Sequence, residues 1–167
     1  TKILDANDWL SVQVHPDDEY AFYHENGQRG KTEMWYVLDA EPGAYLYCGL
    51  SRASSKEEIE ERIKNNTITE ILNKIEVKKG DVVMVKAGTI HAIGAGIFVC
   101  EIQQNSNCTY RMYDYDRRDK FGNKRELHVD KALDVVDTKK YVSYERCEDT
   151  DDKVLEEAAI TLEEDST

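Results

Sequence analysis

The feature that most limits the fold of this chain is a series of short apolar segments separated by turns that contain glycine or proline. Several of these segments alternate polar and apolar residues, which is the two-residue period of a β-strand. Many short strands joined by glycine turns are typical of a β-sandwich or β-barrel. We therefore predict a mainly β fold, with strands over residues 10–15, 31–38, 44–49, 82–85, 90–93, 97–103 and 109–115.

One stretch within this series has a helical pattern. Ser54 and Ser55, followed by Glu57 and Glu58, form capping boxes of the kind that begin helices. A second box follows at residues 67–70. We predict a helical hairpin over residues 51–75, packed outside a core made of residues 1–50 and 76–137. The apolar positions that support the two helices are Ile59, Ile63, Ile71, Leu72 and Ile75.

Charge is distributed unevenly along the chain. The net charge is −12, which argues against a nucleic-acid partner because phosphate backbones require basic patches. Residues 145–167 hold ten acidic and two basic residues, so most of the negative charge lies at the end. The rest of the chain therefore remains compatible with an anionic small-molecule substrate. We treat residues 138–167 as a separate acidic segment, and the start of a second β-domain is one interpretation of it.

The sequence contains no signals typical of a membrane or secreted protein. No apolar run approaches the ~20 residues of a membrane span, and no signal-peptide pattern opens the sequence. The four cysteines are scattered and form no CxxC pair, which gives no support to a zinc finger or a disulfide scaffold. We expect a protein of the reducing cytoplasm, without a membrane partner.

The segment from Ser11 to His15 contains the first residues that could bind a metal. In a strand, Ser11, Gln13 and His15 share one face, while Val12 and Val14 share the other. Imidazole nitrogens suit divalent transition metals, and an amide oxygen can add a further ligand. Pro16 should end the strand and leave His15 at its rim. Polar residues on a solvent-facing strand would give the same pattern without any metal.

Two further stretches extend this candidate site. Glu33 lies on the next predicted strand, and His91 follows a glycine-containing turn. Together with His15 and Gln13 they form a mixed nitrogen and oxygen donor set that suits zinc or a similar divalent ion. By contrast, we interpret His24 and His128 as ordinary surface or loop histidines.

The spacing around His91 resembles the second cupin motif, Gly-x5-Pro-x-Gly-x2-His-x3-Asn. This sequence has Gly80, Gly88 and His91 at the matching positions. It departs from the motif at Lys86, where proline is usual, and at Ala95, where asparagine is usual. Neither departure removes a metal ligand. The resemblance implies a cupin-type jelly-roll barrel.

Four longer segments, in the same order along the chain, resemble the short bacterial form of the type I mannose-6-phosphate isomerase family. The segments are LSVQVHPDD (10–18), GKTEMWYVL (30–38), KKGDVVMVKAGTIHAIGAG (78–96) and QQNSNCTYRMYDYDR (103–117). The resemblance implies a zinc-dependent isomerase that interconverts mannose 6-phosphate and fructose 6-phosphate. Members of the family are longer, with residues before Thr1 and a second β-domain after the tail, so a fragment or a natural short form is expected.

The resemblance also implies roles for individual residues. His15, Glu33 and His91 match the zinc ligands, with Gln13 as a fourth, and Arg111 matches an active-site arginine. Further positions match polar residues of the substrate pocket, namely Ser11, Lys31, Glu101 and Arg117. The reaction moves a carbonyl from C1 to C2 through a cis-enediol and needs a base, for which Glu101 and Lys31 are the candidates. Arg111 is suited to a phosphate or an enediolate oxygen, and Glu101 is its alternative, purely structural partner.

Two other functions stay open at this point. A cupin oxygenase would use the same two histidines and one carboxylate for iron, and oxygen uptake would identify it. It would have little need for Lys31, Arg111 and Arg117 together. A non-catalytic sugar-phosphate-binding module would bind its ligand tightly without isomerising it.

Overall fold

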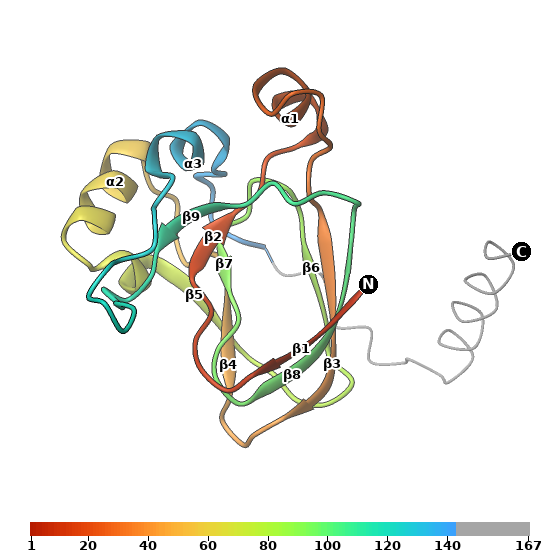
Figure 1. Ribbon diagram of the computed structural model, residues 1–167. Coiled ribbons are helices and arrows are strands. Elements are labelled where there is room, and N and C mark those ends of the chain that lie inside the picture. The colour runs from red at the N-terminus through yellow and green to blue at the C-terminus, as the bar shows by residue number, and fades with distance from the viewer. Residues whose placement is uncertain (143–167) are drawn as a thin grey trace, which may run out of the picture.

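The computed structural model of the chain describes residues 1–142, which form two antiparallel sheets that face each other (Figure 1). Sheet 1 has the strand order β1-β8-β3-β6, and sheet 2 has the order β5-β4-β7-β2-β9. The prediction of a mainly β cupin-type barrel is confirmed. The strands are β1 (Lys2–Ala6), β2 (Val12–Val14), β3 (Glu33–Ala40), β4 (Tyr45–Leu50), β5 (Leu72–Glu76), β6 (Val82–Val85), β7 (His91–Ala92), β8 (Ile97–Gln103) and β9 (Tyr110–Tyr113).

The interior between the sheets is apolar at one end and polar at the other. Strand β3 pairs with β8 and β6, and its alternate residues Trp35 and Val37 are buried with Val83 and Val99 of those neighbours. Toward the start of β3 the same inward row continues into Glu33. The alternation of β3 therefore places the Glu33 carboxylate on the same inward face as the core residues Trp35 and Val37.

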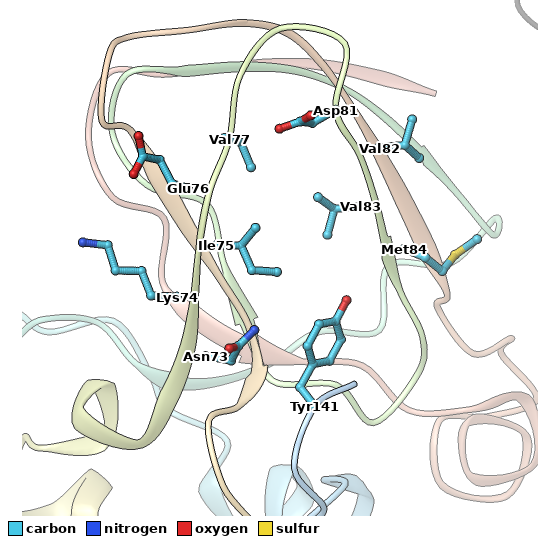
Figure 2. Close-up of a pocket in the computed structure, with 10 residues that line it drawn as sticks. All are labelled: Asn73, Lys74, Ile75, Glu76, Val77, Asp81, Val82, Val83, Met84 and Tyr141. Carbon is cyan, nitrogen blue, oxygen red and sulfur yellow. The ribbon is translucent and has the colours of Figure 1, made fainter. Parts of the chain in front are cut away.

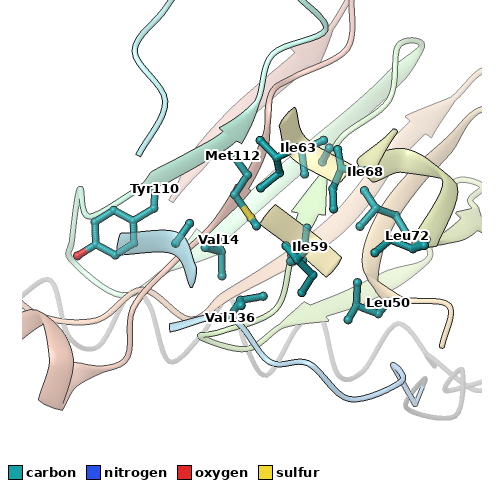
Figure 3. Packing of buried hydrophobic residues seen from close by; sticks show 14 residues of the cluster. Val14, Leu50, Ile59, Ile63, Ile68, Leu72, Tyr110, Met112 and Val136 are labelled. Carbon is teal, nitrogen blue, oxygen red and sulfur yellow. The ribbon is translucent and has the colours of Figure 1, made fainter. Parts of the chain in front are cut away.

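The outer face of sheet 2 is covered by helices. Helix α2 (Lys56–Lys64) and helix α3 (Val129–Val135) lie beside β2, β9 and β5 (Figure 1). Ile59 and Ile63 of α2 pack in one cluster with Val14 and Met112 of the sheet (Figure 3). Packing of the predicted α2 outside the barrel is confirmed. The short helix α1 (Asp18–His24) begins at the cap Asp17, because the Asp17 carboxylate accepts the backbone N–H of Tyr20.

The second half of the predicted helical hairpin was wrong. Residues Ile68–Ile71 form only a 3-10 turn, and Leu72–Glu76 continue as strand β5. Ile71, Leu72 and Ile75 fit a helical spacing, but β5 pairs antiparallel with β4 over Leu46 and Ile75. The open edge of β4 supplies hydrogen bonds that a second helix would not use, so tertiary pairing overrides the local pattern.

Part of the predicted acidic segment, from residue 143 onward, lies outside the described residues. Within residues 1–142, none of the helices has the length and the apolar content that a membrane crossing requires.

Gly94, between β7 and β8, is packed so closely that a side chain cannot be added. A Cβ atom there would lie 1.9 Å from the carbonyl oxygen of Tyr45 and 3.1 Å from the Trp9 ring. We expect Gly94→Ala to lower the free energy of unfolding by at least about 1–3 kcal/mol, the usual scale for overpacking. Urea denaturation of the purified variant measures this. Gly43→Ala is the control, because a Cβ there meets no atom within 4 Å and only its φ of +78° is unfavourable. Equal losses in the two variants would contradict the steric explanation.

Candidate metal centre

Three predicted metal ligands converge between the two sheets. His15 follows β2, His91 begins β7 and Glu33 begins β3, so two ligands come from sheet 2 and one from sheet 1. One ligand atom from each of them lies within 4.8 Å of the other two, and all three side chains are buried. Because ligand bonds to zinc are about 2.0–2.2 Å long, this separation suits three ligands around one ion.

Hydrogen bonds hold both imidazoles in a metal-binding orientation. The Nδ1 atom of His15 lies 3.0 Å from the Cys108 carbonyl oxygen, and that of His91 lies 2.8 Å from the Thr89 carbonyl oxygen. A carbonyl oxygen only accepts, so each Nδ1 carries the proton and each Nε2 has a lone pair that can bind a metal. Outer-sphere partners of this kind fix the tautomer and the ring orientation of metal-ligating histidines.

Glu33 provides a buried oxygen that lacks a normal hydrogen bond. Its Oε1 atom lies 2.5 Å from His15 Nε2 and 2.9 Å from Lys31 Nζ, yet it has no partner of hydrogen-bond geometry among the described residues. Its other oxygen accepts the indole N–H of Trp35 at 3.1 Å. A buried carboxylate oxygen without a hydrogen bond, beside two imidazole lone pairs, is a donor set that a divalent cation completes, so the residues fit a metal.

The protonation states of the three ligands also suit a metal. Burial lowers the pKa of the His91 imidazole to about 3, and burial lowers that of His15 despite the opposing effect of Glu33. Burial alone would raise the pKa of Glu33, but the two histidines and Lys31 outweigh it and lower that pKa. Near neutral pH the imidazoles are therefore neutral and the carboxylate is ionised, as metal binding requires.

A cavity of about 300 Å³ reaches the three converging side chains at His91, which lines it. Gln13, Lys31, Glu101 and Arg111, all predicted site residues, line it together with His91. A larger cavity of about 520 Å³ lies between β5 and β6 (Figure 2), but none of its lining residues is a predicted site residue. The chemistry-bearing side chains are therefore gathered at the smaller cavity.

Gln13 and Lys31 both contact the ligand atoms. The Gln13 amide nitrogen lies 3.3 Å from His91 Nε2, whose lone pair accepts its N–H. Lys31, which is also buried, has its ammonium 3.4 Å from His15 Nε2 in addition to its ion pair with Glu33. Both side chains thus lie close enough to take part in chemistry at a bound ion.

Glu101 projects into the same cavity from β8, opposite Trp35. Burial raises the pKa of the Glu101 carboxyl, and the neighbouring negative charge of Glu33 adds to the increase. Its ion pair is with Lys2, at 3.7 Å. We did not predict Lys2 as a site residue, although it lines the cavity. The alternation of Lys2 with Leu4 along β1 could have indicated its inward direction.

Arg111 lies on β9 opposite Gln13. Its guanidinium donates to the Glu126 carbonyl oxygen at 2.8 Å, while its buried Nε has no partner in the described part of the chain. The alternative partner that we considered, Glu101, forms no ion pair with it within residues 1–142. His128, expected to be an ordinary surface histidine, accepts the backbone N–H of Arg111 through Nδ1 at 3.1 Å. The sequence contains no motif that could have indicated this contact.

Ser11 and Arg117 are not among the residues that line the metal-centre cavity. Ser11 is buried just before β2. Arg117 lines a neighbouring cavity of about 470 Å³ and donates to the Trp9 carbonyl oxygen at 2.5 Å. It also pairs with the Asp114 carboxylate at 2.5 Å, which Arg125 contacts through two hydrogen bonds.

The Asp114 cluster leads to a pH-dependent prediction. Burial would raise the pKa of Asp114, but the hydrogen bonds from Arg125 and Arg117 outweigh it and lower that pKa below 3.8. A carboxyl with a depressed folded-state pKa stabilises the fold above its unfolded pKa and loses this contribution as the pH falls through the folded value. We expect Asp114→Asn to reduce the free energy of unfolding at pH 7 and the deficit to shrink below about pH 4. Urea titrations of both proteins across this range test it, and a deficit independent of pH would contradict it.

Comparisons with known proteins find relatives of this chain. No family model matches the chain. It is 54% identical over 136 residues to mannose-6-phosphate isomerase from Streptococcus mutans, a match that covers 81% of this chain and 42% of the relative. It is 52% identical over 137 residues to the enzyme ManA of Bacillus subtilis, covering 82% and 43%.

A solved structure gives the same result in three dimensions. The crystal structure of the mannose 6-phosphate isomerase from Bacillus subtilis superposes with a TM-score of 0.78 at 42% sequence identity, covering 85% of this chain and 45% of that one. The chain spans less than half the length of the relatives that it matches. Over that span, the chain belongs to the mannose-6-phosphate isomerase family.

Proposed function

We propose that the chain provides the zinc site and the catalytic groups of an isomerase that interconverts mannose 6-phosphate and fructose 6-phosphate. The observation that carries the proposal is the convergence of His15, Glu33 and His91 beside a cavity that also contains Lys31, Glu101 and Arg111. The names of the relatives, which are mannose-6-phosphate isomerases, supply the substrate class.

The proposed metal ligands are His15, Glu33 and His91, with Gln13 as a fourth. Gln13 would turn its amide oxygen toward the ion, because its nitrogen now contacts His91 Nε2. When bound, zinc polarises carbonyl and hydroxyl oxygens and stabilises the negative charge that develops on them. A single ion per chain is sufficient for this site.

Glu101 is our choice for the general base. Its carboxylate would remove the proton from C2 of the open-chain aldose, and the C2–H electron pair would form the C1–C2 double bond of a cis-enediol as the C1 carbonyl oxygen takes up a proton. Return of a proton to C1, with formation of the C2 carbonyl, gives the ketose. A carboxyl whose pKa is raised by burial is a stronger base than an exposed one, which favours Glu101 for this role. Lys31 is the alternative base.

Arg111 and Lys31 are suited to the negative charges of the substrate. The buried Nε of Arg111 lacks an acceptor among the described residues, and an enediolate or phosphate oxygen would supply one. The Lys31 ammonium lies among the metal ligands and would contact an oxygen near the ion. For Ser11 and Arg117, a substrate-binding role rests on the family resemblance alone.

A coupled assay on the 167-residue chain tests this function. With zinc bound, the chain should form fructose 6-phosphate from mannose 6-phosphate, lose this activity in a chelator and regain it when zinc returns. The Glu101→Gln variant should keep its zinc and lose most of its turnover, because an amide cannot accept the C2 proton. Full turnover in that variant would transfer the role of base to Lys31.

One alternative function is a sugar-phosphate-binding module without catalysis. Tight binding of mannose 6-phosphate by the zinc-loaded chain, without any isomerisation, would identify that function. Oxygen uptake by an iron-loaded chain would identify an oxygenase. A cytoplasmic location stays a prediction.

A further inference from the structure

We propose that His128 is a positioning residue that holds Arg111 at the metal-centre cavity through the backbone of β9. The inference rests on the proposed function only in assuming that Arg111 meets an anionic substrate. None of the sequence motifs includes His128, and it contacts neither the metal ligands nor the cavity lining other than Arg111 among the contacts described for it.

His128 contacts both backbone groups of Arg111. The Arg111 N–H donates to His128 Nδ1 at 3.1 Å, and the His128 N–H donates to the Arg111 carbonyl oxygen at 2.8 Å. Strand β9 is the last strand of sheet 2, so its outer edge has no neighbouring strand to provide these partners. His128 therefore takes the place of a neighbouring strand at the residue of β9 that lines the cavity.

The same segment also orients the side chain of Arg111. The Glu126 carbonyl oxygen accepts one guanidinium N–H at 2.8 Å, two residues before His128. The buried Nε is left without an acceptor among residues 1–142. Glu126 and His128 thus hold the backbone and one end of the guanidinium, while another donor of the same group remains available for a ligand.

A salt-bridge cluster holds this segment against β9. Asp114, just after β9, is contacted by Arg117 and by Arg125. Arg125 directly precedes Glu126, so the bridge to Asp114 closes the loop of residues 115–124 and returns the chain to the edge of β9. The loop closure therefore fixes the segment that contacts Arg111.

His128 also occupies the N-cap of helix α3, a position where histidine is not a favoured residue. It is the N-cap residue of α3, yet its side chain makes no capping hydrogen bond. Serine, asparagine and aspartate are the usual N-caps, and each would stabilise the helix start. The imidazole instead accepts the backbone N–H of Arg111, so the side chain holds the backbone of Arg111 rather than capping the start of α3.

This conflict between two roles allows a sharp test. In His128→Ser the hydroxyl can cap α3 but is too short to reach the Arg111 N–H. In His128→Asn the side-chain oxygen can replace Nδ1 as the acceptor. His24→Ser is the matched control, because His24 lies on α1 and stacks on Tyr20. All three variants are made in the full chain, loaded with zinc, and checked for metal content and melting temperature.

We expect His128→Ser to keep its zinc and melting temperature while kcat/KM for mannose 6-phosphate falls about 10-fold or more, because a small displacement of a substrate-binding group lowers the rate on this scale. Affinity for a hexitol 6-phosphate, which has no carbonyl to isomerise, should fall in parallel. His128→Asn should recover most of both values, and His24→Ser should match the wild type. Unchanged kinetics and affinity in His128→Ser, or an equal loss in His128→Asn, would overturn the proposal.

A spectroscopic measurement separates this proposal from the proposed function. The NMR signals of the Arg111 backbone N–H and Nε–H should shift in His128→Ser and return toward the wild-type positions in His128→Asn. This result would support the positioning role even if the chain neither isomerises nor binds sugar phosphates, in which case only the proposed function fails. Wild-type Arg111 signals in His128→Ser would reject the positioning role whatever the activity.

Discussion

Glu33→Gln is expected to remove zinc binding and, with it, isomerase turnover. The amide keeps the shape of the carboxylate but not its charge, and the site, with Gln13 as the fourth ligand, then offers a divalent ion two imidazoles and two neutral amides. Metal content by atomic absorption should fall to background after dialysis, and turnover should fall by at least about 10²–10³, the scale for losing one electrostatic donor to the reacting oxygens. Retention of one equivalent of zinc would contradict the assignment of Glu33.

The same substitution should also weaken the fold of the metal-free protein. Lys31 is buried beside Glu33 at 2.9 Å, and removing one partner of a buried ion pair costs about 3–5 kcal/mol because the other charge is left uncompensated. Urea denaturation in a chelator measures this loss directly. The double variant Lys31→Met, Glu33→Gln should recover a large part of it. Glu19→Gln on the exposed face of α1 is the matched control and should change neither metal content nor stability.

Much of the fold could be predicted because its strands keep a strict two-residue period. Val12 and Val14 on β2, and Trp35 and Val37 on β3, are buried as their alternation indicates. The period fails for Leu72 and Ile75, whose three-residue spacing fits a helix although they lie on strand β5. Only the edge of β4, a partner distant in sequence, decides between the two, and a local pattern contains no information about it.

The convergence of His15, Glu33 and His91 could be predicted from residue type, strand face and the cupin spacing. The other residues at the cavity differ in how far the sequence indicates their positions. Glu101 and Arg111 follow from the family resemblance, but the pairing of Glu101 with Lys2 needs the register of β1 against β8. The contact of His128 with Arg111 depends on a loop closed by Asp114 and Arg125, and no periodicity predicts where such a loop returns.

Arg111→Ala is expected to cut kcat by about 10²–10³ while zinc content stays normal, because a donor to the reacting oxyanion is lost and no metal ligand changes. The structure argues against a purely structural role. Within residues 1–142, Glu101 pairs with Lys2 rather than with Arg111, and the buried Nε of Arg111 faces no acceptor. An unpartnered buried donor is costly, so an anionic ligand is the partner that would satisfy it.

Arg111→Lys separates charge from geometry. A lysine restores the positive charge but not the planar, bidentate fork, so it should recover only a small part of the lost kcat. If Arg111 acted only through the Glu126 carbonyl to stabilise the fold, both variants would lose melting temperature in proportion to their loss of activity. Near-normal turnover in a folded, zinc-loaded Arg111→Ala protein would remove Arg111 from the catalytic set. The loss of kcat/KM expected for His128→Ser would then fail with it, while the contact of His128 with the Arg111 backbone would still be tested by the NMR signals of Arg111.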